Sequence, residues 1–233
     1  MIEIPSFNEL IEKSIVNNWD KDALTDFKGA TLQYHDVARK IEKLHIMFES
    51  SGVQRGDKIA LCGRNSSNWA VAFLATLTYG AVAVPILHEF TADQIHNIVN
   101  HSEAKLLFVG DYVATIIDQT KMPDLEGIIY IPDYSLVVSR TDKLTYAREH
   151  LNAMFGEKYP KFFRKEHVHY YREQSPEELA LINYTSGTTG SSKGVMILYR
   201  SLWSNYDFDM TAVATQSKKG DNVISIPPIA PST

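Results

Sequence analysis

Cysteine is almost absent from the sequence. The one cysteine, Cys62, lies in the apolar run KIALCG, so the chain cannot form an internal disulfide, and a reducing compartment suits it. Because apolar residues precede it in the sequence, we predict a buried structural thiol rather than a reactive one.

Positive charge is also in short supply. The sequence holds 23 Lys and Arg against 28 Asp and Glu, a formal charge of -5, and no basic cluster forms a stripe that would follow a nucleic-acid backbone. Nucleic acid is therefore not an expected partner. The amino terminus, MIEIPSFNELIEKS, has acids where a secretory signal has bases, and it lacks a continuous apolar core, so nothing in it directs export.

One uncharged stretch, WAVAFLATLTYGAVAVPIL at residues 69–87, mimics a membrane span in length. Gly80 and Pro85 divide it into two parts, which a continuous membrane helix would not favour. The division predicts an apolar helix that ends near Tyr79, followed by a short β-rich piece, as in the core of an α/β protein.

Helix and strand patterns alternate along the first 131 residues. We expect a helix after a capping box of Ser6 and Glu9, two short strands about Gly29, a helix that ends at Gly52, a strand at 58–63, a helix to Tyr79, a strand at 81–86, a helix opened by Thr91 and Gln94, a strand at 104–110, a short helix after Asp111 and a strand at 127–131. This alternation predicts an α/β fold, with a doubly wound, mostly parallel sheet and covering helices.

The rhythm changes after residue 131. Residues 132–174 read as a polar, aromatic-rich connection or insertion with one helix at roughly 142–156, which separates a first subdomain at 1–131 from the start of a second at 175–233. Within the connection, His167 and His169 would share one side of an extended segment. A third ligand is missing nearby, so solvated or hydrogen-bonded histidines are favoured over a metal site, and we identify no metal ligand.

The stretch YTSGTTGSSKGV is the strongest functional signal in the chain. Its hydroxyls, its glycines and one lysine suit the phosphates of a nucleotide, because small residues let backbone N–H groups approach a polyanion closely. The candidate phosphate-binding residues are Thr185, Ser186, Gly187, Thr188, Thr189, Gly190, Ser191, Ser192, Lys193 and Gly194. A strand pattern precedes the stretch and another follows it. Gly194 follows Lys193, so the loop is not the strand-to-helix loop of the Walker type.

The loop resembles the signature loop of the adenylate-forming (AMP-binding) enzymes, which include acyl-CoA synthetases, amino-acid adenylation domains and luciferases. GVQRGDKIALCGRNSSNWAVAFLATLTYGAVAVPI also resembles the amino-terminal half of these enzymes. The general pattern and the connection at 132–174 look most like a bacterial long-chain fatty-acid–CoA ligase. The resemblance implies the fold of the N-terminal domain of acyl-CoA synthetases.

The resemblance also implies a two-step reaction. A carboxylate attacks the α-phosphate of ATP to give acyl-AMP and pyrophosphate, and the thiol of coenzyme A then displaces AMP. ATP, Mg²⁺ and coenzyme A are the implied cofactors and substrates, a fatty acid is the implied acid, and the implied location is cytoplasmic with peripheral contact at the inner membrane face. We assign no catalytic residue, because the substrate carboxylate is already ionised. An amino-acid or aryl-acid adenylating enzyme, or a stand-alone ATP-binding module, are the alternatives.

The sequence departs from the family pattern in two places. Ser192 stands where the family usually has proline, which frees a backbone N–H before Lys193. Pro231 falls where a histidine would be expected, and the segments that the family places further on, including its C-terminal domain, do not occur in these 233 residues. We therefore expect the chain by itself to have little or no ligase activity.

Overall fold

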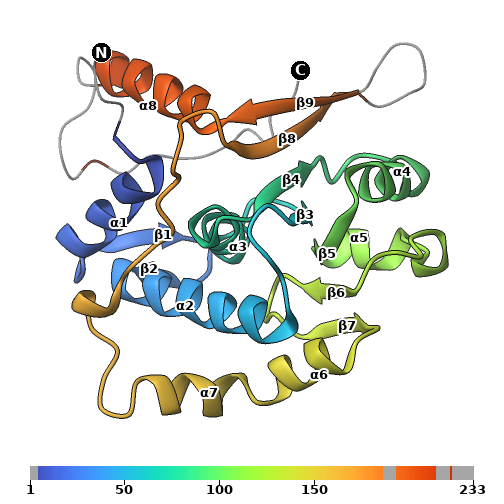
Figure 1. The fold of residues 1–233 in the computed structure, drawn as a ribbon, viewed down its shortest axis with the longest axis horizontal. Coiled ribbons are helices and arrows are strands. Elements are labelled where there is room, and N and C mark those ends of the chain that lie inside the picture. Colours follow the sequence, from blue (N-terminus) through green and yellow to red (C-terminus); the bar gives the residue numbers. More distant parts are fainter. Residues whose placement is uncertain (1–4, 186–192, 214–220, 222–233) are drawn as a thin grey trace.

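A computed structural model describes residues 5–185, 193–213 and 221 of the chain. Its centre is a seven-stranded sheet of order β7-β6-β5-β3-β4-β8-β9 (Figure 1). The strands are β3 (Lys58–Cys62), β4 (Val82–Ile86), β5 (Ala104–Val109), β6 (Gly127–Tyr130), β7 (Leu136–Ser139), β8 (Leu179–Thr185) and β9 (Lys193–Leu198). Strands β6, β5, β3, β4 and β8 are parallel, and β7 and β9 are antiparallel to their neighbours. The predicted mostly parallel sheet is confirmed.

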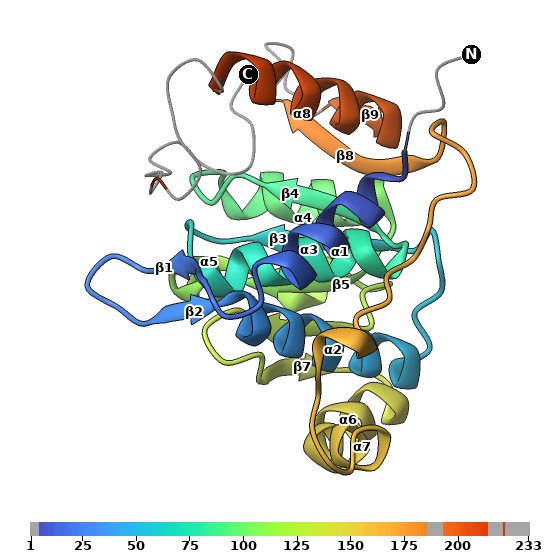
Figure 2. The same cartoon turned by 90° about the vertical axis from the view of Figure 1, so that its left-hand side faces the viewer.

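Helices cover both faces of this sheet, as the doubly wound prediction requires (Figure 2). Alternate residues of β3 face opposite sides: Ile59 and Leu61 belong to the core beneath α1 (Phe7–Asn17), α2 (Tyr34–Ser51) and α3 (Ser67–Tyr79). Ala60 and Cys62 belong to the core beneath α4 (Ala92–Ser102) and α5 (Asp111–Ile116). Because both faces of the central strands are buried, the strands read as continuous apolar runs.

The helix boundaries follow from capping residues and glycine. The Thr91 hydroxyl accepts a hydrogen bond from the Gln94 N–H and the Gln94 side chain accepts one from the Thr91 N–H, so the predicted capping box of α4 is confirmed. Helix α2 ends at Gly52, whose φ of 90° lies in the left-handed region that glycine adopts without strain. The two short strands predicted about Gly29 are also present, as β1 (Asp22–Thr25) and β2 (Thr31–Gln33), and they pair antiparallel.

The capping box predicted for α1 is only half formed. Ser6 accepts a hydrogen bond from the Glu9 N–H, but the Glu9 carboxylate pairs instead with Lys13 at 2.8 Å. Glu173, more than 160 residues away, takes its place by accepting hydrogen bonds from the Ser6 hydroxyl and the Phe7 N–H. The prediction was wrong in this detail because a negative charge from elsewhere in the chain stabilises the helix start.

Residues 168–174 form a segment between α7 and β8, which we call the strap. Along it, the Glu12 carboxylate accepts hydrogen bonds from the Tyr170 N–H at 2.8 Å and from Arg172 Nη2 at 2.7 Å. The Tyr171 N–H donates to the Thr78 carbonyl at 2.9 Å. The strap therefore holds α1 and the end of α3 together.

The region at 132–174 contains more structure than the sequence predicts. Strand β7 joins the sheet antiparallel to β6, and its position was read as a connection. The single helix expected at roughly 142–156 is divided into α6 (Asp142–Glu149) and α7 (Leu151–Lys158) at His150, whose φ of -99° and ψ of 6° leave helical values. Both helices pack against α2. The division of the chain into subdomains at 131 and 175 stays a prediction.

The uncharged stretch at 69–87 is the buried helix α3 followed by the buried strand β4, as predicted. Among the residues that the structure describes, no helix combines the length and the apolar character that a bilayer crossing needs. The Cys62 side chain is fully buried, as predicted, and burial raises the pKa of its thiol.

Candidate functional site

The candidate phosphate loop connects β8 and β9 in a hairpin. Parallel pairing of β4 with β8, through Ala83 and Leu181, places the end of β8 at the edge of the sheet where β3, β4 and β5 also end. Thr185 is the last residue of β8 and pairs with Lys193, the first residue of β9. The prediction that the loop joins two strands is confirmed.

Thr185 and Lys193 form the mouth of this hairpin, and they are the described members of the predicted set together with Gly194. The Thr185 side chain is half-buried and that of Lys193 is exposed, so the lysine ammonium faces solvent at the carboxyl edge of the sheet. Ser186, Gly187, Thr188, Thr189, Gly190, Ser191 and Ser192 lie outside the described residues.

Tyr184 anchors the strand just before the loop. Its ring is buried, and its hydroxyl lies 2.7 Å from Nδ1 of His101, near the end of α4. The two rings meet edge to face with centroids 5.7 Å apart. Burial raises the pKa of the Tyr184 phenol, so the hydroxyl keeps its proton in this contact. This contact holds Tyr184, the residue before Thr185, to helix α4.

Gly194 is required by close packing across the hairpin. A Cβ atom at this position would lie 3.0 Å from Cγ2 of Ile182 and 3.0 Å from Cζ of Tyr184. A larger residue would clash with the Tyr184 ring, so glycine at position 194 lets β9 pair closely with β8.

The other end of the hairpin is fixed by the turn at 175–178. The Glu178 carboxylate accepts hydrogen bonds from the Gln174 and Ser175 N–H groups, and the Glu178 carbonyl accepts one from the Tyr199 N–H at 3.0 Å. The Tyr199 hydroxyl donates to the Leu77 carbonyl at 3.0 Å. Helix α8 (Tyr199–Val213) thus begins against α3, and both ends of the hairpin are held by the main fold.

A crevice opens at the same sheet edge, between the loops that follow β3 and β5. The chain leaves β3 toward β4 and leaves β5 toward β6, on the other side, so this is the point where the winding of the sheet reverses. A cavity of about 330 Å³ lies there, lined by residues that include Arg64, His88 and Asp111. Gly63 and Gly110 let the two loops touch, because a Cβ on Gly110 would lie 3.1 Å from the Gly63 Cα. Ligands of open α/β sheets bind in crevices of this kind.

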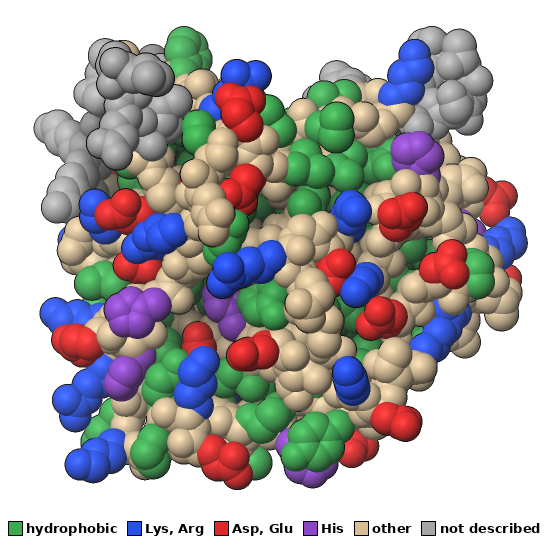
Figure 3. Space-filling model, viewed as in Figure 1, with side chains coloured by type: hydrophobic (Ala, Val, Ile, Leu, Met, Phe, Trp, Pro, Cys, Tyr) green, Lys and Arg blue, Asp and Glu red, His purple; other side chains and the backbone are tan. Residues whose placement is uncertain are grey.

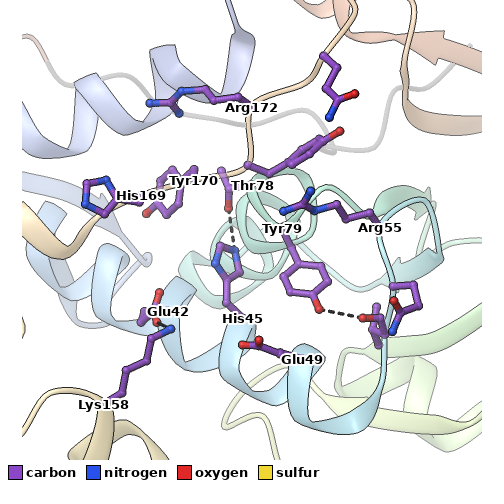
Figure 4. Close-up of a pocket in the computed structure, with 14 residues that line it drawn as sticks. Glu42, His45, Glu49, Arg55, Thr78, Tyr79, Lys158, His169, Tyr170 and Arg172 are labelled. Carbon is purple, nitrogen blue, oxygen red and sulfur yellow. Dashed lines mark hydrogen bonds and ion pairs between the residues drawn. The ribbon is translucent and has the colours of Figure 1, made fainter.

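A cavity of about 960 Å³ lies at the opposite edge, where the strands begin (Figure 4). Glu42 accepts hydrogen bonds from Lys158 and the Tyr159 hydroxyl, each at 2.8 Å, and Tyr79 donates to the Val53 carbonyl at 2.8 Å. The Arg55 guanidinium lies 4.5 Å from the Tyr171 ring centroid. These polar groups mostly bond one another, and the strands separate them from the loop, so we do not assign this cavity to phosphate binding.

The histidines of the connection have local roles. His167 Nδ1 accepts a hydrogen bond from the Arg164 N–H at 2.9 Å, as the hydrogen-bonded interpretation predicts, while His169 is exposed. No group of three or more His, Cys, Asp or Glu side chains that could hold a metal occurs in the described part of the chain. On the face shown in Figure 3, acidic and basic side chains are interspersed.

Sequence reasoning missed the contacts that support the loop. The hydrogen bond between His101 and Tyr184 joins residues 83 positions apart, and no local sequence pattern predicts it. The cavity between the loops after β3 and β5 was also missed, although Gly63 and Gly110 directly after two apolar runs were a usable signal.

Comparison with known proteins gives a family and a fold. The model of the AMP-binding enzyme family matches residues 11–232. A Bacillus subtilis protein named as an acyl–CoA ligase is 27% identical over 173 residues, which are 74% of this chain and 31% of that protein. Long chain acyl-CoA synthetase 3 of Arabidopsis thaliana is 27% identical over 169 residues, which are 72% of this chain and 25% of that protein. The chain thus spans about a third or less of the length of these two relatives.

Solved structures share the fold. The crystal structure of the anthranilate CoA ligase AuaEII in complex with anthranoyl-AMP matches with a TM-score of 0.68 and 18% sequence identity, over 92% of this chain and 37% of that one. The match confirms the predicted α/β architecture across nearly the whole chain.

Proposed function

The chain belongs to the AMP-binding enzyme family, and on that premise we propose that it is the amino-terminal part of an ATP-dependent acid–CoA ligase. The proposed reaction joins a carboxylic acid to AMP with release of pyrophosphate and then transfers the acyl group to coenzyme A. The observation that carries the proposal is the family match over residues 11–232. A loop rich in glycine and hydroxyl groups, ending at Lys193, lies within that match.

In this proposal the loop holds the phosphates of ATP. Thr185 and Lys193 face each other at the mouth of the hairpin, so a phosphate chain held by the intervening residues would lie between a hydroxyl and an ammonium group. Negative charge grows on the pyrophosphate as it leaves, and the Lys193 ammonium would counter it. The hydrogen bond between Tyr184 and His101 would hold the end of β8 in place when the phosphates bind.

The attacking group belongs to the substrate. A carboxylate is ionised at neutral pH, so the first step needs no general base, and we assign none. Magnesium would accompany ATP and offset phosphate charge. The described residues include no group of three or more His, Cys, Asp or Glu side chains that could hold it.

The proposed acid is a long-chain fatty acid. The likeness to a protein named as a long chain acyl-CoA synthetase supports this choice, whereas the likeness to an anthranilate CoA ligase supports an aryl acid as the second candidate. Long-chain acids partition into lipid, so a cytoplasmic location with peripheral contact at the inner membrane face belongs to the proposal.

We expect the 233-residue chain to bind ATP weakly and to lack turnover. The relatives have more than two thirds of their length outside the aligned region, and a nucleotide held by one loop would lack contacts on its other side. Formation of acyl-CoA by the chain alone would contradict this expectation.

The test of the proposed function is acid-dependent exchange of labelled pyrophosphate into ATP, catalysed by the product of the complete reading frame. A panel of long-chain, aryl and amino acids separates the candidate substrates. Lys193→Ala should abolish exchange, while Lys161→Ala, which removes an exposed lysine far from the loop, should leave it unchanged. No exchange with any acid, or full exchange in Lys193→Ala, would refute the assignment.

A further inference from the structure

A second group of positive charges lies far from the loop, in a cavity of about 390 Å³ between α2 and the helices α6 and α7. Four cations line it: Arg39, Lys40 and Lys43 from α2, and Arg148 from α6. We call this set the α2–α6 cluster. Helix α6 packs beside β7 at one end of the strand order, whereas β8 and β9, which flank the loop in the sequence, are at the other end (Figure 1).

The two lysines of the cluster have neutral partners. Lys40 Nζ donates to Oδ1 of Asn68 at 3.2 Å, and Lys43 Nζ donates to Oδ1 of Asn152 at 2.8 Å. Lys40 also lies 5.6 Å from the Tyr134 ring centroid. Amide oxygens and ring faces satisfy hydrogen-bonding capacity but do not cancel a full positive charge.

The two carboxylates of the cavity leave an excess of positive charge. Asp36 lies 3.3 Å from Arg39 and accepts a hydrogen bond from the Gln33 N–H, and Asp133 accepts one from the Ser135 N–H at 2.8 Å. Four cations against two carboxylates leave two positive charges in a chain whose net charge is -5. The excess is therefore local and runs against the charge of the whole protein.

Lys43 experiences this excess directly. Desolvation and then the positive charges of Arg39, Lys40 and Arg148 hold its pKa below the ordinary value of lysine. Arg39 and Lys43 are also one helical turn apart on α2, a spacing at which like charges destabilise a helix. The folded chain keeps a repulsion that a bound anion would relieve.

We propose that the α2–α6 cluster binds a small anion that carries a phosphate group. Two uncompensated positive charges match a phosphate monoester, which carries a charge of about -1.5 to -2 at neutral pH. The buried side chains of Leu44, Leu151 and Tyr134 form an apolar floor, which strengthens the attraction between charges above it. The cavity is also in the size range of small-molecule sites. The inference does not depend on the proposed ligase activity.

The first experiment titrates inorganic phosphate into the chain at constant ionic strength and measures binding by calorimetry and by the shift in melting temperature. Because the phosphate loop offers a second anion site, every protein carries Lys193→Ala as a background substitution. In that background, Lys43→Gln should weaken phosphate binding by roughly tenfold, the loss expected for one charge-assisted contact. Lys143→Gln, which removes an exposed lysine of α6 that does not line the cavity, should leave the affinity unchanged.

The stability of the unliganded variants provides a second measurement. A neutral amide in place of the Lys43 ammonium would not repel the neighbouring cations, so Lys43→Gln without phosphate should melt at the same temperature as its background or higher. Weaker binding together with unchanged or raised stability supports an anion site. Equal phosphate affinity in Lys43→Gln and Lys143→Gln, or no saturable binding in the Lys193→Ala background, overturns the proposal. Exchange activity plays no part in this test, so the two proposals can fail separately.

The source of the phosphate group is found with vesicles. Sedimentation with phosphatidic acid vesicles, lost in Lys43→Gln, identifies a lipid headgroup, and binding of free phosphate without sedimentation identifies a soluble phosphate compound. Each result supports the site. Equal sedimentation with phosphatidylcholine vesicles, without saturable phosphate binding, overturns it.

Discussion

His45 should make the folded chain sensitive to mild acid. Its Nε2–H donates to the Ala75 carbonyl at 3.0 Å and faces the Thr78 hydroxyl at 3.1 Å, and the rings of Tyr79 and Tyr170 lie beside it (Figure 4). Burial lowers the pKa of this imidazole from 6.5 to about 4. The folded state therefore keeps His45 neutral at a pH where the unfolded chain takes up a proton.

The sign and the size of the effect follow from these two pKa values. Below pH 6.5 the unfolded state gains a proton that the folded state refuses, so stability falls as the pH falls and reaches its full loss below about pH 4. Between about pH 7 and about pH 5 the loss is about 2 kcal/mol at most. The adjoining cavity admits solvent to the ring, so we expect about 1–2 kcal/mol.

Urea unfolding at about pH 7 and about pH 5 tests this reasoning. His45→Gln keeps a neutral donor but cannot take a proton, so it should lose about 1–2 kcal/mol less than the wild type between the two pH values. His150→Gln removes an exposed histidine and should behave as the wild type. Other titrating groups are common to all three proteins and cancel in the comparison. Equal losses in all three proteins would refute a neutral, half-buried His45.

Three further predictions concern Gly127, Gly156 and Tyr184, and a fourth concerns the buried thiol. Gly127→Ala should destabilise the chain by about 1–3 kcal/mol in urea, because its Cβ would lie 2.1 Å from Cδ2 of Leu144. Gly156→Ala has no atom within 4 Å of the added Cβ and should instead stabilise α7 by about 0.5–1 kcal/mol; destabilisation there would contradict the described helix. Tyr184→Phe should cost about 1 kcal/mol by loss of one partly buried hydrogen bond, and an unchanged urea midpoint would speak against that bond. The Cys62 thiol should react with an aromatic disulfide reagent only in the unfolded chain, and fast reaction under native conditions would contradict its burial.

Local signals account for the parts of the fold that the sequence predicts. Thr91 with Gln94 and Gly52 each act within a few residues, so they can be read without knowledge of the rest of the chain. The apolar runs of β3 and β5 reveal strands buried on both faces for the same reason. The loop at 185–194 is recognisable because its glycines, hydroxyl-bearing residues and lysine lie within ten consecutive residues.

Features that depend on distant partners escaped prediction. Strand β7 has only four residues in a polar region, and pairing with β6 rather than its own pattern makes it a strand. Glu173 has no local feature that marks it as the cap of α1. The α2–α6 cluster was invisible for a related reason, since Arg148 meets the cations of α2 only after α6 folds back along it.

The contacts of the strap at 168–174 also limit when helix α1 can become ordered during synthesis. The Phe7 N–H bonds to Glu173, 166 positions later in the chain, and the Asn8 side chain bonds to Tyr199, 191 positions later. At a synthesis rate of roughly 5–20 residues per second, the amino-terminal helix spends on the order of 10–40 s on the ribosome before these partners exist. Strands β3, β4 and β5 find one another within about 50 residues of chain, so they can assemble during that interval. Helix α1 is synthesised well before these partners and is held in place only after them, so in the interval its apolar side is open to chaperones and to other nascent chains.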